Sequence, residues 1–288
     1  MIFTKILCPT DFSDHARPSF EHAVRLAKLY GATLTILHAV EPPPFTADYV
    51  APAVARDFEV ATERSLAEAA AFARERGVPT VETTQAIGSP WRAIVDAVAA
   101  DHAIDLVVMG THGRTGFRRV LLGSVAEKVV RLAASSVLVV HPEDKLDRVA
   151  HVLCPTDFVD PTEHAAQVAV QLAGPDAKLE LVHVVDVPLL VERGTHPVAI
   201  STELEQHSDV ELERRAKALG PNVTWRTELG HVGTKLLELL DREAFDLVVT
   251  GSHNFTGLAH ILLGSIAEKL VRHARCPVLV VRRRGVAL

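Results

Sequence analysis

The chain has 288 residues, of which 48% are hydrophobic and 23% charged, and its formal net charge at pH 7 is −6. The length suits one large domain or two of ordinary size, and the composition is that of a globular protein, which excludes a disordered one. The longest basic run is Arg282 to Arg284, against an acidic background. Nucleic acid is therefore disfavoured as a partner.

No apolar run approaches the roughly 18 residues that span a bilayer, so we expect no membrane partner. The N-terminus runs directly into a strand pattern without the features of a signal peptide, which favours the cytoplasm. Three cysteines, Cys8, Cys154 and Cys276, are an odd number and are expected to be buried and reduced. The sequence has no paired Cys/His spacing of the kind that binds zinc, so zinc is disfavoured and no metal site is expected.

The chain is a tandem repeat. The segment from Lys5 to Phe12 recurs at 151–158, with Cys-Pro-Thr-Asp-Phe in both copies, and Val137–Val140 recurs as Val278–Val281. The joint is expected in the charged segment between the copies, which predicts two domains, residues 1–144 and 148–288.

Within each copy, continuous apolar runs alternate with helical patterns. This alternation predicts an α/β fold with a parallel sheet covered by helices on both faces. In the first copy the patterns predict strands at about 3–8, 33–40, 80–86, 105–109 and 136–141, and helices at about 14–30, 56–76, 90–100 and 124–132.

Local signals predict where some helices begin and end. Gly31 and Gly77 stand where helices should end. Asp160-Pro161 predicts a helix start with an acidic N-cap. The segments 124–127 and 265–268 both read Ser-x-Ala-Glu and predict capping boxes.

Two proline-containing segments, Glu41–Arg56 and Asp186–Ile200, have neither strand nor helix periodicity. Loops at the ends of strands commonly carry function and move. We therefore expect both segments to be mobile loops near the ligand face.

The stretch 105–124 carries the strongest chemical signal. A buried strand pattern leads into a loop with three glycines and three arginines, and Gly123-Ser124 then opens a helix. Glycines let backbone N–H groups approach a ligand, a helix start adds unpaired N–H groups, and arginines match phosphate oxygens. Ligands of open α/β sheets sit where the strand order reverses, so Asp11 after the first strand would face the same crevice. The loop residues are Gly110, Gly113, Gly116, Arg114, Arg118 and Arg119.

The spacing Gly110-x2-Gly113-x9-Gly123-Ser124 is similar to the nucleotide motif G-x2-G-x9-G-[ST] of the universal stress protein family. Together with Pro-Thr-Asp after the first strand, the resemblance covers essentially the whole chain as two domains in series. It implies an adenine nucleotide alpha hydrolase-like αβα fold in each domain, with a five-stranded sheet of order 3-2-1-4-5. Members commonly pair through the last strand, so both pairing of the two domains within one chain and a homodimer are open.

The resemblance also implies the ligand, ATP with or without Mg²⁺, and the residues around it. Pro9, Thr10, Asp11 and Val40 would frame adenine and ribose. Ribose and phosphates would lie against Met109, Gly110, His112, Gly113, Arg114, Gly123, Ser124, Val125 and Ala126. A weaker second site would comprise Asp157, Val185, Gly251, Gly264 and Ser265.

The second copy departs from the motif. Asn254 stands at the middle glycine, and the loop arginines have no counterpart. Each lost charge-assisted hydrogen bond is worth about 1.5–3 kcal/mol, so losing even two that contact the ligand would weaken binding by about a hundredfold or more. Arg118 and Arg119 have two open interpretations, as phosphate contacts or as solvated side chains. We expect the first domain to bind ATP tightly and the second weakly or not at all. In place of Arg114, Arg118 and Arg119 the second copy has Phe255, Ala259 and His260.

For several single residues, a catalytic or ligand-binding role competes with a simpler structural one. Ser124 is better explained as a helix cap near phosphate than as a nucleophile, and Asp11 as a ribose or adenine ligand than as a general base. His38 and His183 end apolar strands and are expected to be structural. His112 is favoured as a phosphate contact, His253 as an ordinary loop residue, and no catalytic residue is expected.

The sequence thus favours an ATP-binding stress-response regulator that acts through conformational or partner changes on an unidentified protein. The alternative is an enzyme, either a slow ATPase or a nucleotidyl or phosphoryl transferase using the same crevice. Against it, the sequence has no P-loop lysine pattern, no evident base and no second carboxylate pair. A ligand-free dimerisation scaffold is a third alternative.

Overall fold

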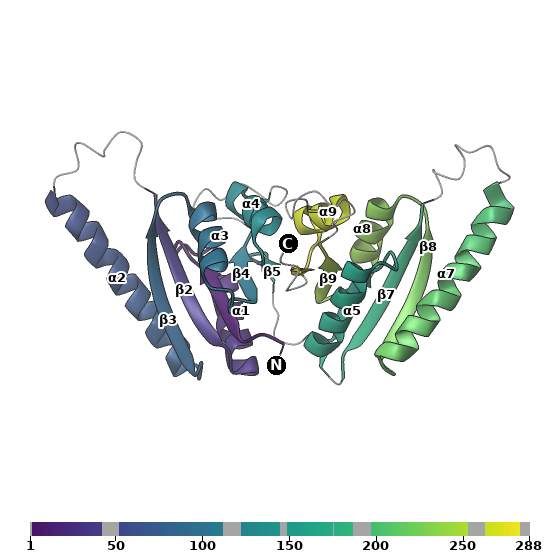
Figure 1. The fold of residues 1–288 in the computed structure, drawn as a ribbon, viewed down its shortest axis with the longest axis horizontal. Helices are drawn as coiled ribbons and strands as arrows, with labels where there is room; N and C mark the ends of the chain where they lie inside the picture. The colour runs from purple at the N-terminus through teal and green to yellow at the C-terminus, as the bar shows by residue number, and fades with distance from the viewer. Residues whose placement is uncertain are drawn as a thin grey trace. The chain divides into compact units, whose positions relative to one another are not determined.

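The computed structural model describes residues 2–41, 52–111, 122–144, 149–174, 176–186, 197–252 and 263–282, without the side chains of 52–58, 160–161 and 197–202. The chain divides into two compact units, Met1–Glu143 and Asp144–Leu288, called here the first and the second unit (Figure 1).

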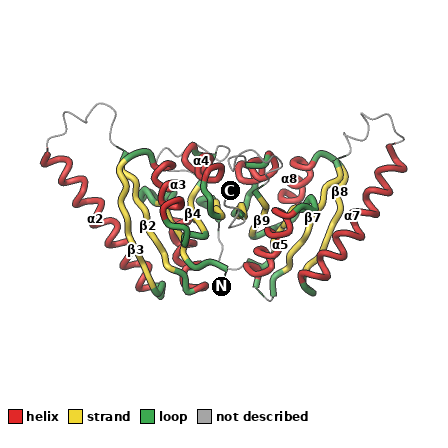
Figure 2. The backbone as a smooth tube through the Cα atoms, viewed as in Figure 1, coloured by secondary structure: helices red, strands yellow, loops and turns green. Residues whose placement is uncertain are grey.

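The first unit alternates strands and helices along the chain, as Figure 2 shows. Its strands are all parallel in the order β3-β2-β1-β4-β5, which confirms the predicted order. The elements are β1 (Lys5–Pro9), α1 (Arg17–Tyr30), β2 (Thr33–Val40), α2 (Pro52–Glu75), β3 (Thr80–Ile87), α3 (Pro90–Ala100), β4 (Leu106–Gly110), α4 (Ser124–Leu132) and β5 (Ser136–Val140).

The second unit repeats this arrangement, with the parallel order β8-β7-β6-β9-β10. Its elements are β6 (His151–Pro155), α5 (Asp160–Ala173), β7 (Lys178–Val185), α7 (Pro197–Leu219), β8 (Val223–Leu229), α8 (Val232–Arg242), β9 (Leu247–Gly251), α9 (Ser265–His273) and β10 (Val278–Val281).

The helices cover both faces of each sheet. Parallel crossovers are right-handed, so α1 and α2 share one face while α3 and α4, which follow the reversal of direction, share the other. The contacts agree with this arrangement. The rings of Phe20 of α1 and Phe72 of α2 pack with their centroids 5.7 Å apart, and α3 packs against α4. In the second unit α5 packs against α7, and α8 against α9.

Four inner strands, β1, β4, β6 and β9, are buried along most of their length, which explains their apolar sequence. Cys8 and Cys154 occupy these strands, and burial raises the pKa of each thiol to about 12. Cys276 is buried as well, and all three cysteines are free, as predicted.

Each sheet also carries a polar cluster. In the first unit, the ammonium of Lys5 lies 2.6 Å from Glu82 and 2.9 Å from Asp101. In the second, Arg226 of β8 donates to Glu180 of β7 at 2.7 Å and to Glu243 at 2.6 Å. The side chain of Glu180 is only 8% exposed, so its charge depends on Arg226 for compensation.

The predicted helix ends are confirmed. Gly31 follows α1 in the left-handed region, with φ 63°, and its N–H donates to the carbonyls of Ala27 and Lys28. Gly77 follows α2 with φ 91°, and its N–H donates to the Arg74 carbonyl at 2.9 Å. A side chain with Cβ would be strained at both positions.

Several predicted helix starts need correction. The first helix begins at Arg17 and not near residue 14, because residues 10–13 form a separate turn. The last residues of the predicted loops Glu41–Arg56 and Asp186–Ile200 are helical, since α2 begins at Pro52 and α7 at Pro197. Proline suits the first helical position, where its missing N–H costs nothing. The remainder, 42–51 and 187–196, lies outside the described residues.

The predicted capping boxes and the acidic N-cap are wrong by one residue. The N-caps of α4 and α9 are Gly123 and Gly264, and neither helix has a side-chain cap. Their carbonyls accept the first helical hydrogen bonds, from Glu127 at 3.0 Å and Glu268 at 2.9 Å. The N-cap of α5 is likewise Val159, one residue before Asp160.

Candidate functional site

The strand order reverses between β1 and β4 in the first unit. The two strands are parallel neighbours, with Ile6 opposite Leu106, which confirms the adjacency expected from the sequence. Pro9, Thr10 and Asp11 therefore leave the sheet on the same edge as Gly110. We call this edge, formed by the carboxyl ends of the strands, the carboxyl edge. Open parallel sheets bind ligands there.

Residues 10–13 form a tight turn at the carboxyl edge, called here the Asp11 turn. Both the N–H and the hydroxyl of Ser13 donate to Oδ1 of Asp11, at 3.0 and 2.6 Å. The N–H of Phe12 donates to Oγ1 of Thr10 at 3.0 Å. These bonds hold Phe12 at φ 59°, a left-handed conformation that is strained for a residue with a side chain.

His38 of β2 supports the Asp11 turn. Its Nδ1 lies 2.7 Å from the carbonyl oxygen of Thr10, and since a carbonyl only accepts, Nδ1 carries the proton. The ring of Phe12 lies over the imidazole, with centroids 4.8 Å apart. His38 is buried and satisfied, as expected for a structural histidine.

The start of α4 is tied to the end of β4. The N–H of Gly123 donates to the carbonyl of Thr111 at 2.8 Å, and the N–H of Thr111 donates to Val140 at 3.1 Å. Ser124, Val125 and Ala126 are the first three residues of α4, so their N–H groups have no acceptor within the helix. With the positive end of the helix dipole, they form a fitting environment for phosphate at the carboxyl edge.

The described part of the first unit thus brings together most of the predicted site residues. The side chain of Asp11 is half-buried, Ser124 is exposed and Met109 is buried. The carbonyl of Val40 already accepts the N–H of Gly88 at 2.9 Å. At the carboxyl edge or the start of α4 lie Pro9, Thr10, Asp11, Val40, Met109, Gly110, Gly123, Ser124, Val125 and Ala126. The predictions for His112, Gly113, Arg114, Gly116, Arg118 and Arg119 fall outside the described residues.

The second unit places its counterparts in the same way. β6 and β9 are neighbours, with Val152 opposite Leu247. Asp157 follows β6, Val185 and Gly251 end β7 and β9, and Gly264-Ser265 begins α9. The predictions for His253, Asn254, Phe255, Ala259 and His260 fall outside the described residues.

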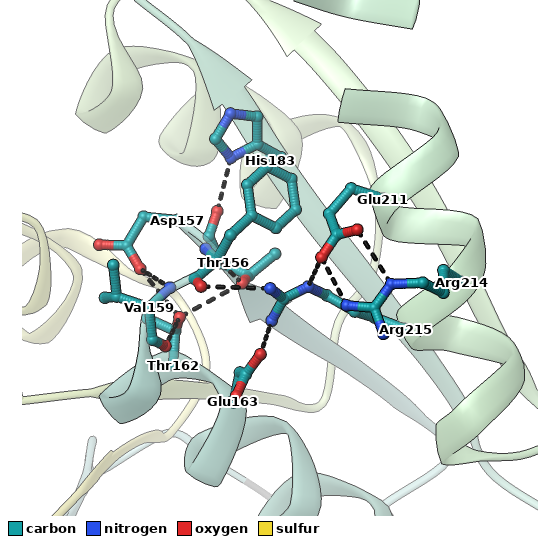
Figure 3. Close-up of polar contacts among 10 residues, drawn as sticks. Thr156, Asp157, Val159, Thr162, Glu163, His183, Glu211, Arg214 and Arg215 are labelled. Atoms are coloured by element: carbon teal, nitrogen blue, oxygen red, sulfur yellow. Dashed lines mark hydrogen bonds and ion pairs between the residues drawn. The ribbon is translucent and has the colours of Figure 1, made fainter. Parts of the chain in front are cut away.

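The equivalent turn, residues 156–159, is called the Asp157 turn (Figure 3). Thr156 and His183 repeat the roles of Thr10 and His38. The N–H of Phe158 donates to Oγ1 of Thr156 at 3.1 Å, and Nδ1 of His183 lies 2.8 Å from the carbonyl oxygen of Thr156. Phe158 has φ 66° and stacks on His183 at 4.3 Å. Asp157 is exposed, and its Oδ1 accepts from the hydroxyl of Thr162 at 2.8 Å.

A cation that no sequence pattern had singled out reaches the Asp157 turn. Arg215 of α7 donates to the carbonyl of Phe158 at 3.2 Å, and also to Glu211 and Glu163. Arg214 and Arg215 together lower the pKa of Glu211 to about 2, so this carboxyl is ionised at neutral pH. Nothing in the local sequence links Arg215 to a turn more than 50 residues earlier.

The described part of the chain offers little for a metal or a membrane. It contains no group of three or more His, Cys, Asp or Glu side chains placed to hold a metal ion. Within the same residues, no helix combines the length and the apolar character needed to cross a bilayer.

Both units are therefore open αβα folds with an Asp turn and a helix start at the carboxyl edge, the edge where such sheets bind ligands. The sequence pattern of the universal stress protein family matches residues 3–141 and again residues 149–282. The chain therefore belongs to the universal stress protein family, as a tandem-domain member.

Individual relatives agree with this assignment. The chain is 27% identical to a universal stress protein of Mycolicibacterium smegmatis over 97% of both chains. It is 35% identical to one of Methanocaldococcus jannaschii over 147 residues, which are 50% of this chain and 85% of that protein. The crystal structure of a universal stress protein from Archaeoglobus fulgidus superimposes with a TM-score of 0.68 over 98% of each chain, at 22% identity, and so shows the fold.

Proposed function

We propose that this protein is an ATP-binding regulator in the stress response, with the nucleotide held mainly by residues 1–144. The observation that carries the proposal is the carboxyl edge of the first unit. There the Asp11 turn and the first N–H groups of α4, which have no acceptor within the helix, flank the β1–β4 reversal. Residues 148–288 form the second domain in this proposal.

The two parts of the site suit the two ends of ATP. Asp11, a half-buried carboxylate, supplies acceptors for ribose hydroxyls or the adenine amino group. The start of α4 supplies N–H donors for phosphate oxygens. The glycines and arginines of the sequence motif, among them Gly113 and Arg114, would add close backbone approach and charge.

We propose that the second domain binds the nucleotide weakly or not at all. Its backbone frame matches that of the first unit, but Asn254 and Phe255 stand where the motif has Gly113 and Arg114. The loss of charge-assisted hydrogen bonds removes affinity without altering the fold.

Binding would act on the protein through differential affinity. A ligand shifts a conformational equilibrium only by the difference between its affinities for the two states. In the proposal ATP favours one arrangement of the loops at the carboxyl edge, and a protein partner in the cytoplasm distinguishes the arrangements. Pairing through Val137–Val140 and Val278–Val281, within one chain or between chains, stays a prediction that the mass in solution tests.

The experiment is a count of bound nucleotide. The protein is purified without added nucleotide and denatured, and the released adenine nucleotide per chain is measured by chromatography and mass spectrometry. The proposal expects one ATP per chain, lost in Gly113→Asp. Asp11→Ala should lower the occupancy far more than its matched control, Asp157→Ala.

Three outcomes would contradict the proposal. Two nucleotides per chain would mean that the altered motif of the second domain does not weaken binding. No nucleotide, and no uptake with added ATP and Mg²⁺, would favour the ligand-free scaffold. ATP turnover above about 1 per second, the range of ordinary enzymes, would favour the enzymatic alternative.

A further inference from the structure

All three nitrogens of the Arg215 guanidinium group donate hydrogen bonds, and they connect α7 to both the Asp157 turn and α5 (Figure 3). Nη2 donates to the carbonyl of Phe158 at 3.2 Å, Nε donates to Glu211 at 2.8 Å, and Nη1 donates to Glu163 of α5. The side chain is only 15% exposed. A planar fork with every nitrogen occupied fixes its partners relative to one another.

The half-buried ring of Phe158 contacts two other side chains. It stacks on His183, with centroids 4.3 Å apart, and the guanidinium carbon of Arg215 lies over the ring, 5.1 Å from its centroid. Phe158 is also strained, with φ 66°. Strained backbone persists only where its surroundings enforce it. The hydrogen bond from Arg215 to the Phe158 carbonyl therefore helps to keep this turn in its strained conformation.

The first unit has a different side chain at this position. Phe72 and Arg215 each stand five residues before the glycine that follows their helix, Gly77 or Gly220. The ring of Phe72 packs against Phe20 at 5.7 Å and lies under the guanidinium of Arg76 at 3.9 Å. A phenyl ring cannot donate a hydrogen bond to a carbonyl, so the clamp cannot be repeated by this residue in the first unit.

We infer that Arg215 is a positioning residue that clamps the Asp157 turn to α5 and α7, so that the carboxyl edge of the second unit keeps one conformation whether or not a ligand is present. In the Asp11 turn, Ser13 donates to Asp11 and Nδ1 of His38 donates to the Thr10 carbonyl. The inference concerns the fold of the second unit and does not rest on the proposed binding of ATP to the first.

Amide hydrogen exchange of the full-length protein tests the clamp. In Arg215→Met, we expect exchange across residues 157–163 to accelerate by roughly tenfold or more, because local opening governs the exchange of such segments. Arg215→Lys keeps the charge but loses the fork, and we expect an intermediate acceleration. Residues 11–17 of the first unit should be unchanged in both variants.

Arg214→Met is the matched control. Arg214 also donates to Glu211, at 3.0 and 2.6 Å, but its side chain is 66% exposed. It should leave the exchange of residues 157–163 at the wild-type rate. Amides of β9 report global unfolding, so acceleration confined to the turn separates a lost clamp from a protein that fails to fold.

The inference would be overturned if residues 157–163 of Arg215→Met exchange at the wild-type rate. It would also be overturned if Arg214→Met accelerates their exchange equally. If Arg215→Met also exposes β9, Arg215→Lys decides: selective acceleration of the turn supports the clamp, and uniform acceleration overturns it. Adding ATP and Mg²⁺ to the wild type separates the two proposals. Slower exchange at residues 11–13 tests the ATP site, whereas residues 157–159 should not change.

Discussion

The two units hold the same Thr-Asp-Phe turn by different means. In the first, Ser13 satisfies Asp11 from within the turn, and Phe12 is 36% exposed. In the second, the N–H of Val159 donates to Asp157 from within the turn at 3.3 Å, the hydroxyl of Thr162 also reaches Asp157 from α5, and the half-buried Phe158 contacts His183 and Arg215. A duplicated fold thus keeps a strained backbone geometry and its local hydrogen bonds, and the second unit adds contacts from α5 and α7.

The largest effect, on the affinity for ATP, is expected from exchanging the side chains at the three arginine positions of the loop between the units. Replacing the three arginines of the first unit by their counterparts removes up to three charge-assisted hydrogen bonds to ATP. At about 1.5 kcal/mol each, this should weaken binding by about a thousandfold. Calorimetric titration with ATP and Mg²⁺ measures the change. The variant is Arg114→Phe, Arg118→Ala and Arg119→His.

The reverse exchange in the second unit is the control. Phe255→Arg, Ala259→Arg and His260→Arg, with Asn254→Gly, should create a second, weaker binding event if the backbone frame of the second unit suffices. Unchanged affinity after the first exchange would show that the two units do not differ through these arginines.

The next largest effect concerns the polar clusters of the two sheets. Arg226→Met leaves the buried carboxylate of Glu180 without its cation, which should cost about 3 kcal/mol of unfolding free energy in the second unit. Lys5→Met is the counterpart in the first unit. Since the carboxylates of Glu82 and Asp101 are largely hydrated, it should cost no more than about 1 kcal/mol.

Urea unfolding distinguishes the units, because each contains one of the two tryptophans, Trp91 in α3 and Trp225 in β8. Trp91→Phe leaves fluorescence that reports the second unit, and Trp225→Phe leaves fluorescence that reports the first. Equal losses of unfolding free energy in Arg226→Met and Lys5→Met would contradict the interpretation of Glu180 as a carboxylate that depends on its partner.

A smaller difference is expected at the two strained phenylalanines. Glycine relieves a left-handed conformation that costs roughly 1–2 kcal/mol. In Phe12→Gly the relief should offset the loss of a partly exposed ring, with a net change within about 0.5 kcal/mol. In Phe158→Gly the loss of a ring packed against His183 and Arg215 should dominate, by about 1 kcal/mol. The same unit-specific unfolding measures both, and a more harmful Phe12→Gly would refute the difference in support.

Periodicity and glycine signals predicted the fold closely, since buried parallel strands and Gly-capped helices have strong local causes. The order of the strands and the place of Asp11 came from the resemblance together with the rule for sheet ligands. The helices begin at Ser124 and Asp160 as predicted, but their N-caps lie one residue earlier than predicted, because an extended residue of any kind can act as N-cap when the backbone geometry fits. Arg215 was not predictable, because its partners are brought to it by the packing of α7 on α5.

The smallest expected effect is a dependence of the second unit's stability on pH through His183. Burial lowers the pKa of His183 below its ordinary value of 6.5, while the hydrogen bond to Thr156 and the charge of Asp157 oppose this. Below pH 6.5 the unfolded chain therefore binds a proton that the folded chain binds less readily. The stabilisation is complete above pH 6.5 and is lost as the pH falls through the folded pKa.

His183→Asn tests this, because its amide can donate to the Thr156 carbonyl in place of Nδ1 but does not titrate. We expect the unfolding free energy of the second unit to fall less between pH 7.5 and pH 5 in the variant than in the wild type, with Trp91→Phe in both. All other titrating groups are common to the two proteins and cancel in the difference. If the wild type and His183→Asn lose equal stability, proton uptake by His183 does not contribute, and its role in the second unit is limited to stacking on Phe158 and donating to Thr156.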